Sequence, residues 1–199
     1  MTTQTLSTHD EHHHNADATD VFGFWIYILS DCILFSIIFA TYAVIHTNTY
    51  GGPGLKELTN MPYVLGETMA LLASSFTYGL AILALYKGNR CKLLTWLAIT
   101  FLFGLTFVGM EINEFVHLYI EGHTWQSSAA LSGFFTLVGT HGFHVSMGLL
   151  WMLVMMFQVA KSNITPAISR RLTYLGLFWA FLDIVWIFVF TVVYLMGSI

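Results

Sequence analysis

The residues of this sequence that could do chemistry lie inside stretches that are otherwise almost wholly apolar. Asp31 and Asp183 are single carboxyls in two such stretches, and His141 and His144 stand three residues apart in a third. An ionisable side chain near the middle of a bilayer costs about 2.5–3.5 kcal/mol on insertion scales, so each one is expected to be paired, protonated or functional. These four groups could relay protons, or they could hold helices together through hydrogen bonds.

Three glutamates form a second candidate group. Glu67 and Glu111 lie in two different apolar stretches, and Glu114 follows Glu111 by one helical turn. When two carboxyls meet in an apolar environment, a proton is shared between them or one acid stays neutral. We therefore expect Glu67, Glu111 and Glu114 to form a carboxyl cluster near one face of a membrane.

The spacing of these residues does not match a redox metal site. The run from Glu114 to His117 has the Glu-x-x-His spacing of di-iron bundles, but those sites need two such motifs and two further glutamates. His141 and His144 leave the same face of a helix, so they cannot supply opposed axial ligands to a haem. We expect no metal ligand and no catalytic residue in this chain.

The composition shows which elements must position these groups. Of 199 residues, 56% are hydrophobic and only 9% are charged, whereas a typical soluble domain has roughly 25% charged residues. Too little polar surface remains to coat a globule in water, and no basic patch exists that could bind nucleic acid. Lipid is therefore the expected solvent for most of the chain.

Five stretches are long enough to cross a membrane, because a hydrocarbon core of about 30 Å takes roughly 20 apolar helical residues. Each must be a helix, since backbone donors and acceptors find no water in lipid. The predicted fold is an all-α, polytopic bundle of five transmembrane helices, within a membrane domain at residues 22–199. The predicted spans are Phe22–Ile45, Pro62–Tyr86, Leu93–Leu118, Ala129–Ala160 and Tyr174–Met196.

The basic residues predict the orientation, because loops rich in Lys and Arg stay on the cytoplasmic side. All but one of them lie between the second and third spans or between the fourth and fifth, which are loops on the same side. An odd number of spans then makes the N-terminus cytoplasmic and the C-terminus external. The residues in these loops are Lys87, Arg90, Lys92, Lys161, Arg170 and Arg171, and the exception is Lys56.

The rise of an α-helix brings the aspartates and the histidines to a similar depth. Asp31 and Asp183 fall about 14 Å from the cytoplasmic face, and the two histidines fall about 18–22 Å from the external face. Glu67 and Glu111 fall about 8–10 Å from the external face.

Small or polar residues recur at every fourth position of the fourth span, a pattern that lets membrane helices approach closely. We expect this stripe to face the bundle interior, where the histidines would meet one or both aspartates. A structural clasp is the interpretation we favour, because such hydrogen bonds commonly join membrane helices, and proton transfer is the alternative. The stripe consists of Ser132, Thr136, Thr140, His144 and Gly148.

Residues 1–21 precede the first span and are mostly polar. They include His9, His12, His13 and His14, and a tract of this kind is informative only as composition. We interpret it as a disordered, solvated tail, with metal sensing as the alternative.

Several motifs resemble subunit 3 of the haem–copper respiratory oxidases, in the branch of the bo-type quinol oxidases. Residues 22–35 are similar to the opening helix of that subunit, and residues 139–145 (GTHGFHV) resemble its G-x-H-G-x-H-V motif. Residues 178–186 (FWAFLDIVW) resemble its W-H-F-x-D-x-V-W motif, with Ala180 in place of the usual His. The likeness extends over about residues 22–199, and the motifs occur in the family's order.

This resemblance implies an accessory subunit of a proton-pumping terminal ubiquinol oxidase in the bacterial cytoplasmic membrane. Such a subunit carries no cofactor, because the haems and copper belong to the catalytic subunit 1. It assembles with subunit 1, subunit 2 and a small subunit 4, binds phospholipid, and supports proton uptake and durable turnover. Asp31 matches the family's membrane-embedded carboxylate, whereas any role of the family His does not carry over to Ala180.

Other functions stay open at this point. A cytochrome c oxidase subunit 3 is one alternative, since the electron donor binds elsewhere; five spans rather than seven and the glutamate at Glu111 favour the quinol branch. An independent proton-coupled transporter is disfavoured by the odd number of spans and by the lack of an inverted repeat. A di-iron or haem enzyme is disfavoured by the count of ligands.

Overall fold

The computed structural model describes residues 4–46, 48, 61–122, 124–162 and 164–195. Within these residues every regular element is a helix, and five helices are long and apolar enough to cross a membrane. This confirms the predicted all-helical fold with five spans. The chain divides into two compact units, residues 1–37 and residues 38–199, and each is described by itself.

Helix α1 (Gln4–Ile45) provides the first unit and continues into the second. The part of α1 that is long and apolar enough to cross a membrane is Thr19–Ile45. This range is close to the predicted span Phe22–Ile45. The helix begins inside the segment that we interpret as a disordered tail. That segment contains neither Gly nor Pro, so no strong helix breaker separates it from the apolar residues.

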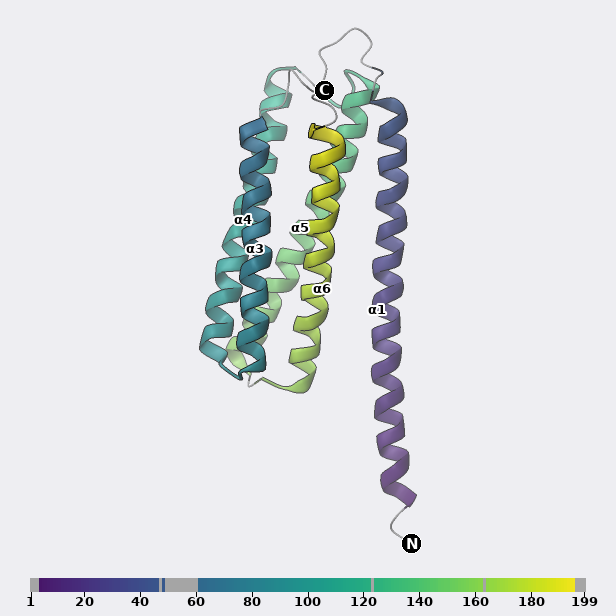
Figure 1. Ribbon diagram of the computed structural model, residues 1–199, viewed down its shortest axis with the longest axis vertical. Helices are drawn as coiled ribbons and strands as arrows, with labels where there is room; N and C mark the ends of the chain where they lie inside the picture. Colours follow the sequence, from purple (N-terminus) through teal and green to yellow (C-terminus); the bar gives the residue numbers. More distant parts are fainter. Residues whose placement is uncertain (1–3, 47, 49–60, 123, 163, 196–199) are drawn as a thin grey trace. The chain divides into compact units, whose positions relative to one another are not determined.

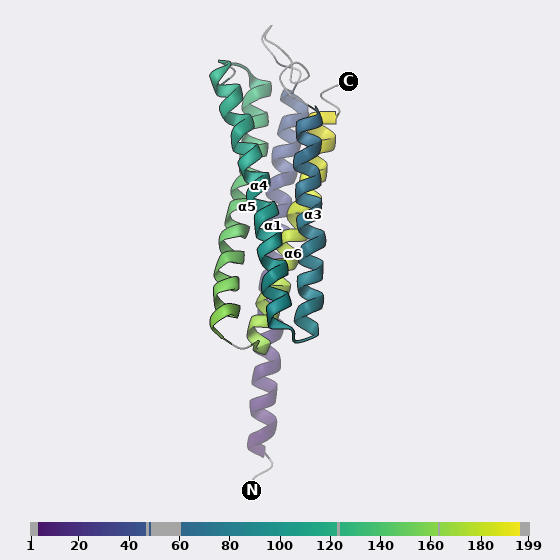
Figure 2. The same ribbon diagram turned by 90° about the vertical axis from the view of Figure 1, so that its left-hand side faces the viewer.

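The rest of the second unit is a bundle of four long helices. Figures 1 and 2 show them side by side, with each helix running antiparallel to the one before it in the sequence. Each packs against two others, in the cyclic order α3, α4, α5, α6 and back to α3. The helices are α3 (Met61–Tyr86), α4 (Arg90–Ile120), α5 (Ala129–Lys161) and α6 (Pro166–Val189), and a π-helical segment η1 (Phe190–Leu195) follows α6.

Two helix starts are capped by hydroxyl side chains. Ser128 accepts a hydrogen bond from the backbone N–H of Leu131 at 3.1 Å, and Thr165 accepts one from the N–H of Ile168 at 3.3 Å. Pro166 follows Thr165 at the first helical position, where its missing N–H costs nothing. Helix α6 therefore starts at Pro166 rather than at the predicted Tyr174. The prediction followed hydropathy, whereas the cap at Thr165 starts the helix before the apolar stretch begins. Met196, the predicted end of this span, lies outside the described residues.

The predicted basic loops are shorter in the structure, because Arg90, Lys161 and Arg171 lie within helices, near their ends. The connections between α3 and α4 and between α5 and α6 lie at one end of the bundle (Figure 1). There the guanidinium group of Arg90, at the start of α4, donates a hydrogen bond to the carbonyl of Ala160 near the end of α5. Arg171 of α6 donates to the side-chain oxygen of Gln158 in α5 at 3.5 Å. The contacts tie three helices together at this end, which we call the basic end.

The middle of the bundle is packed by the buried side chain of Trp179 from α6. Its ring lies against Gly104 of α4 and Gly148 of α5, where an added Cβ would come within 3.1 Å of ring atoms. Its indole N–H donates to the hydroxyl of Ser74 in α3 at 3.0 Å. Two glycines thus make room for the ring, and a small hydroxyl satisfies its single donor.

A second buried tryptophan repeats this arrangement farther from the basic end. The indole N–H of Trp186 donates to the hydroxyl of Thr68 in α3 at 3.0 Å. Between α3 and α4 the hydroxyls of Thr77 and Thr100 lie 2.8 Å apart. These bonds connect helices where lipid offers no competing partner.

Candidate functional site: a buried carboxyl cluster

The three predicted glutamates lie together in the second unit, in the half of the bundle away from the basic end. Glu67 is on α3, and Glu111 and Glu114 are on α4; their exposed fractions are 0%, 3% and 9%. Glu67 is close enough to both of the others for electrostatic interaction. The hydroxyl of Tyr194 in η1 donates a hydrogen bond to Oε2 of Glu114 at 2.9 Å.

Several oxygens of this cluster have no hydrogen-bond partner among the described residues. They are both carboxyl oxygens of Glu67 and Oε1 of Glu111. The lysines and arginines that the structure describes belong to the basic end, and Lys56 lies outside the described residues. Burying an ionised carboxylate without a partner is very costly, so this arrangement suits carboxyl groups that hold protons.

The carboxyl group of Glu111 lies in a notch of the α5 backbone at Gly142. A Cβ added at Gly142 would come within 2.5 Å of both Glu111 oxygens. The notch therefore requires glycine unless Glu111 moves. Neither Gly142 nor Tyr194 was among the predicted site residues, although the glycine between two histidines in residues 139–145 was a signal that could have found Gly142.

His141 of α5 is enclosed by aromatic rings. It is fully buried; its ring packs on that of Trp186 with centroids 5.2 Å apart and meets the edge of Phe107 at 5.9 Å. These rings come from α6 and α4, so His141 stands where three helices meet. His144 lies one turn away and is half-buried, with Nδ1 placed 2.8 Å from the carbonyl of Thr140 in its own helix.

The two aspartates lie on different elements from the histidines. Asp183 on α6 is 8% exposed and lies next to Ser75 of α3, although the two side chains do not meet the geometry of a hydrogen bond. Asp31 lies on α1 in the first unit, where it interacts with Tyr27 one turn earlier. A meeting of the aspartates with His141 and His144 stays a prediction.

The predicted stripe on α5 does not lie wholly on the buried face. Gly148 is buried, whereas Ser132, Thr140 and His144 are half-buried and Thr136 is exposed. A step of four residues overshoots one helical turn by about 40°, so five members spread over about 160° of the helix surface. The stripe therefore crosses the edge of the buried face instead of following its centre.

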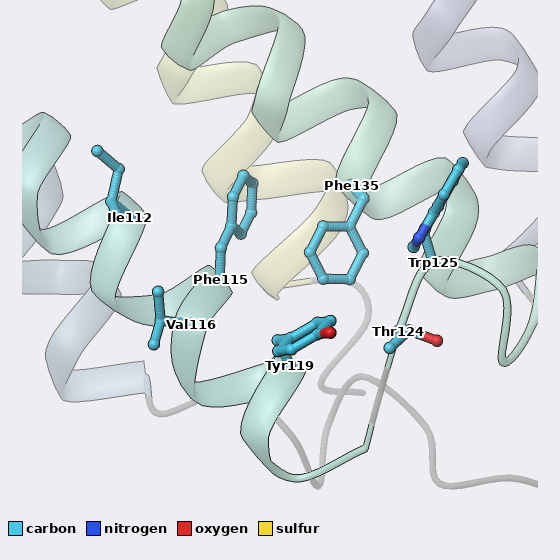
Figure 3. Close-up of a pocket in the computed structure, with 7 residues that line it drawn as sticks. All are labelled: Ile112, Phe115, Val116, Tyr119, Thr124, Trp125 and Phe135. Carbon is cyan, nitrogen blue, oxygen red and sulfur yellow. The ribbon is translucent and has the colours of Figure 1, made fainter.

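A pocket of about 290 Å³ lies between the end of α4, the following loop and α5. Figure 3 shows the rings of Phe115, Tyr119 and Phe135 around this space, with Trp125 beside them. The lining is almost entirely aromatic and aliphatic, so the pocket suits an apolar group. Its lining residues are Ile112, Phe115, Val116, Tyr119, Thr124, Trp125 and Phe135.

Among the described residues, no group of three or more His, Cys, Asp and Glu side chains has a geometry that could hold a metal ion. His141 is enclosed by Trp186 and Phe107, and His144 lies against a carbonyl of its own helix. The carboxyl cluster lacks the histidines that accompany glutamates in di-iron bundles.

Comparison with known proteins gives matches over nearly the whole chain. The family model described as cytochrome c oxidase subunit III matches residues 3–198. Cytochrome bo(3) ubiquinol oxidase subunit 3 from Pseudomonas aeruginosa is 56% identical over 192 residues, which are 96% of this chain and 92% of the relative. Quinol oxidase subunit 3 from Bacillus subtilis is 43% identical, with 94% and 92% of the two chains covered.

A relative with a different electron donor in its name is nearly as similar. Cytochrome c oxidase subunit 3 from Bacillus sp. (strain PS3) is 41% identical over 200 residues, covering 100% of this chain and 97% of the relative. These matches confirm the resemblance seen in the sequence motifs, and the five apolar helices agree with a multi-pass membrane protein. The chain therefore belongs to the cytochrome c oxidase subunit III family.

Proposed function

We propose that this chain is the accessory subunit of a terminal ubiquinol oxidase, an assembly that oxidises quinol and reduces oxygen in aerobic respiration. The observation that carries the proposal is the 56% identity to a ubiquinol oxidase subunit 3 over almost the full length of both chains. The quinol oxidase subunit from Bacillus subtilis, with 43% identity, supports the same branch. We place this subunit in the bacterial cytoplasmic membrane.

The chain contributes support rather than redox chemistry. Haems and copper are held by the catalytic subunit 1, and the partners are subunit 1, subunit 2 and a small subunit 4. The names of the relatives, subunit 3 of ubiquinol and quinol oxidases, support its place in a multi-subunit assembly. Bound phospholipid and the support of proton uptake belong to the same proposal.

The carboxyl cluster acts as a proton-holding clasp in this function. It joins α3 through Glu67, α4 through Glu111 and Glu114, and the C-terminal end of the bundle through Tyr194. Neutral carboxyl groups can both donate and accept hydrogen bonds, whereas carboxylates can only accept. Protons shared among the three acids would therefore hold these elements together without a counter-ion.

The orientation follows from the basic end, which we place in the cytoplasm with the N-terminus, while the C-terminus is external. Arg90 and Arg171 are both bonded at this end. A C-terminal epitope tag in spheroplasts tests the orientation, with protease removing the tag if the C-terminus is external. A tag that stays protected until the cells are opened contradicts it.

Purification under mild conditions tests the function. A tagged copy of this chain should bring with it a larger, haem-containing polypeptide and quinol oxidase activity that is sensitive to haem-site inhibitors. A lone, colourless protein that transports a solute would contradict the proposal, and so would iron bound stoichiometrically to the isolated chain. Activity with reduced cytochrome c in place of quinol would move the chain to the cytochrome c branch.

A further inference from the structure

The N-terminal part of α1 lies ahead of the residues suited to cross a membrane, which begin at Thr19. It contains four of the nine histidines of the chain, all within residues 9–14 (HDEHHH). Residues 1–20 include four acidic residues and neither Lys nor Arg. The segment therefore has a net negative charge, which attracts cations rather than anions.

The helical backbone gives these histidines a fixed register. Helix α1 runs without a break from Gln4 to Ile45 (Figure 1), and successive residues of an α-helix are rotated by about 100°. Positions 9, 12 and 13 then fall within about 100° of one another, on one face. Position 14 lies about 140° from position 9, away from that face. A disordered tail, which we expected from the composition, would have no such register.

His9 and His13 have the spacing of two zinc ligands on a helix. In H-E-x-x-H helices, two histidines four residues apart lie on one face and bind Zn²⁺. His12 follows His9 by three residues, so it shares this face. Neutral imidazole is a good ligand for zinc, copper and nickel ions, and short His-rich tracts are typical of metal binding. The face with positions 9, 12 and 13 thus carries three potential nitrogen ligands.

This pattern distinguishes the tail from the rest of the chain. Among the side chains that the structure describes from Thr19 onward, no three His, Cys, Asp or Glu residues could hold a metal ion. A cation inside a span would also have to leave water at a high cost. Residues 4–18 precede the span, so water can complete the coordination of an ion there.

We propose that the face of α1 with His9, His12 and His13 binds a divalent transition-metal ion, for which Zn²⁺ is the probe. Such a site departs from the expectation that the chain has no metal ligand, because that expectation considered no helical register in the tail. It does not depend on the proposed oxidase function.

Zinc binding to the full-length protein tests the proposal. The protein is purified with the subunits that accompany it, through a C-terminal tag without histidine, and is freed of loosely bound metal by a chelator. Equilibrium dialysis with radioactive Zn²⁺ then compares the parent with His13→Ala and His14→Ala. A triple variant with His9→Ala, His12→Ala and His13→Ala measures the zinc that is bound elsewhere.

His13→Ala should weaken the tail-dependent binding roughly tenfold or more, because even the loss of a group that only orients a metal ligand costs 10–100-fold. His14→Ala is the matched control, since it removes a neighbouring histidine that is off the face, and it should match the parent. Equal zinc binding by the parent and the triple variant overturns the proposal. Equal losses in His13→Ala and His14→Ala also overturn it, because composition and not register would then hold the ion.

Backbone hydrogen exchange gives a second measurement that other zinc sites do not affect. A short helical segment is marginally stable in water, and an ion that binds only the helical form stabilises it. At a Zn²⁺ concentration ten times the Kd, exchange of the amides of residues 9–13 should slow roughly tenfold. The parent and His14→Ala should show this protection, and His13→Ala should lose it. Zinc binding with unchanged exchange in the parent overturns the helical site.

The two proposals fail separately. A chain that purifies without a haem protein contradicts the proposed function, whereas its zinc binding and its hydrogen exchange still decide whether the tail holds a metal ion.

Discussion

Two layers of the bundle differ in how their buried polar side chains are hydrogen-bonded. In the layer around Trp179, the indole donor finds Ser74 and the ring finds space at glycines. In the layer around Glu67, carboxyl oxygens are buried without hydrogen-bond partners among the described residues. The first layer is complete by itself and contributes stability. In the second, the protons that we propose the three acids share would supply the missing hydrogen bonds.

The largest effect is expected from the satisfied layer. Trp179→Ala removes a fully buried ring and leaves a cavity, and it should lower the free energy of unfolding by about 3–5 kcal/mol. The midpoint of heat-induced aggregation of this subunit in the purified oxidase measures the change. Trp125→Ala is the control, because Trp125 is 62% exposed. Equal shifts for the two variants would contradict the picture of a tryptophan-packed core.

An intermediate effect is expected where the two layers share α5. Gly142→Ala places a methyl group 2.5 Å from the carboxyl oxygens of Glu111. Relief of this overlap should cost about 1–3 kcal/mol, as overpacking does in other cores. The heat midpoint of Gly142→Ala should fall below that of Gly109→Ala, which meets no neighbour. A midpoint equal to the parent would show that Glu111 moves freely.

A smaller effect is expected from the one hydrogen bond between Tyr194 and the cluster. Tyr194→Phe keeps the ring and removes the donor to Glu114, which should cost about 0.5–1.5 kcal/mol. Tyr119→Phe serves as the control, since Tyr119 is 71% exposed. A Tyr194→Phe protein as stable as its control would mean that Glu114 finds another donor.

The smallest change in stability is expected at Glu67. A neutral carboxyl and an amide have nearly the same shape, and each offers a donor and an acceptor. Glu67→Gln should therefore change the free energy of unfolding by less than the loss of one hydrogen bond, about 0.5–1.5 kcal/mol. The informative measurement is infrared, where the variant should lose intensity in the carbonyl band of protonated carboxylic acids. Glu121→Gln, at an exposed carboxyl 3.4 Å from Nδ1 of His117, should keep that band. An unchanged band in Glu67→Gln would show that Glu67 is ionised.

The sequence predicted which segments form the helices of the bundle. It did not predict which face of each helix points into the bundle. The four spans from Pro62 onward lie close to the helices that the structure shows, and the largest difference is at the start of α6, where Thr165 and Pro166 form a cap. Glu67 also lies close enough to Glu111 and Glu114 for electrostatic interaction. The similar depths of Glu67 and Glu111 could be calculated from helical rise. The stripe from Ser132 to Gly148 drifts off the buried face, because its four-residue period is not that of the helix.

By itself the sequence determined the number of spans and their approximate ends. Each of these depends on local composition, since twenty apolar residues in a row cross lipid whatever their neighbours are. Only the tertiary structure decided that Trp186 packs on His141, that Gly142 admits Glu111 and that Tyr194 completes the cluster. In lipid both the packed and the exposed faces of a helix are apolar, so hydropathy carries no signal for which face turns inward.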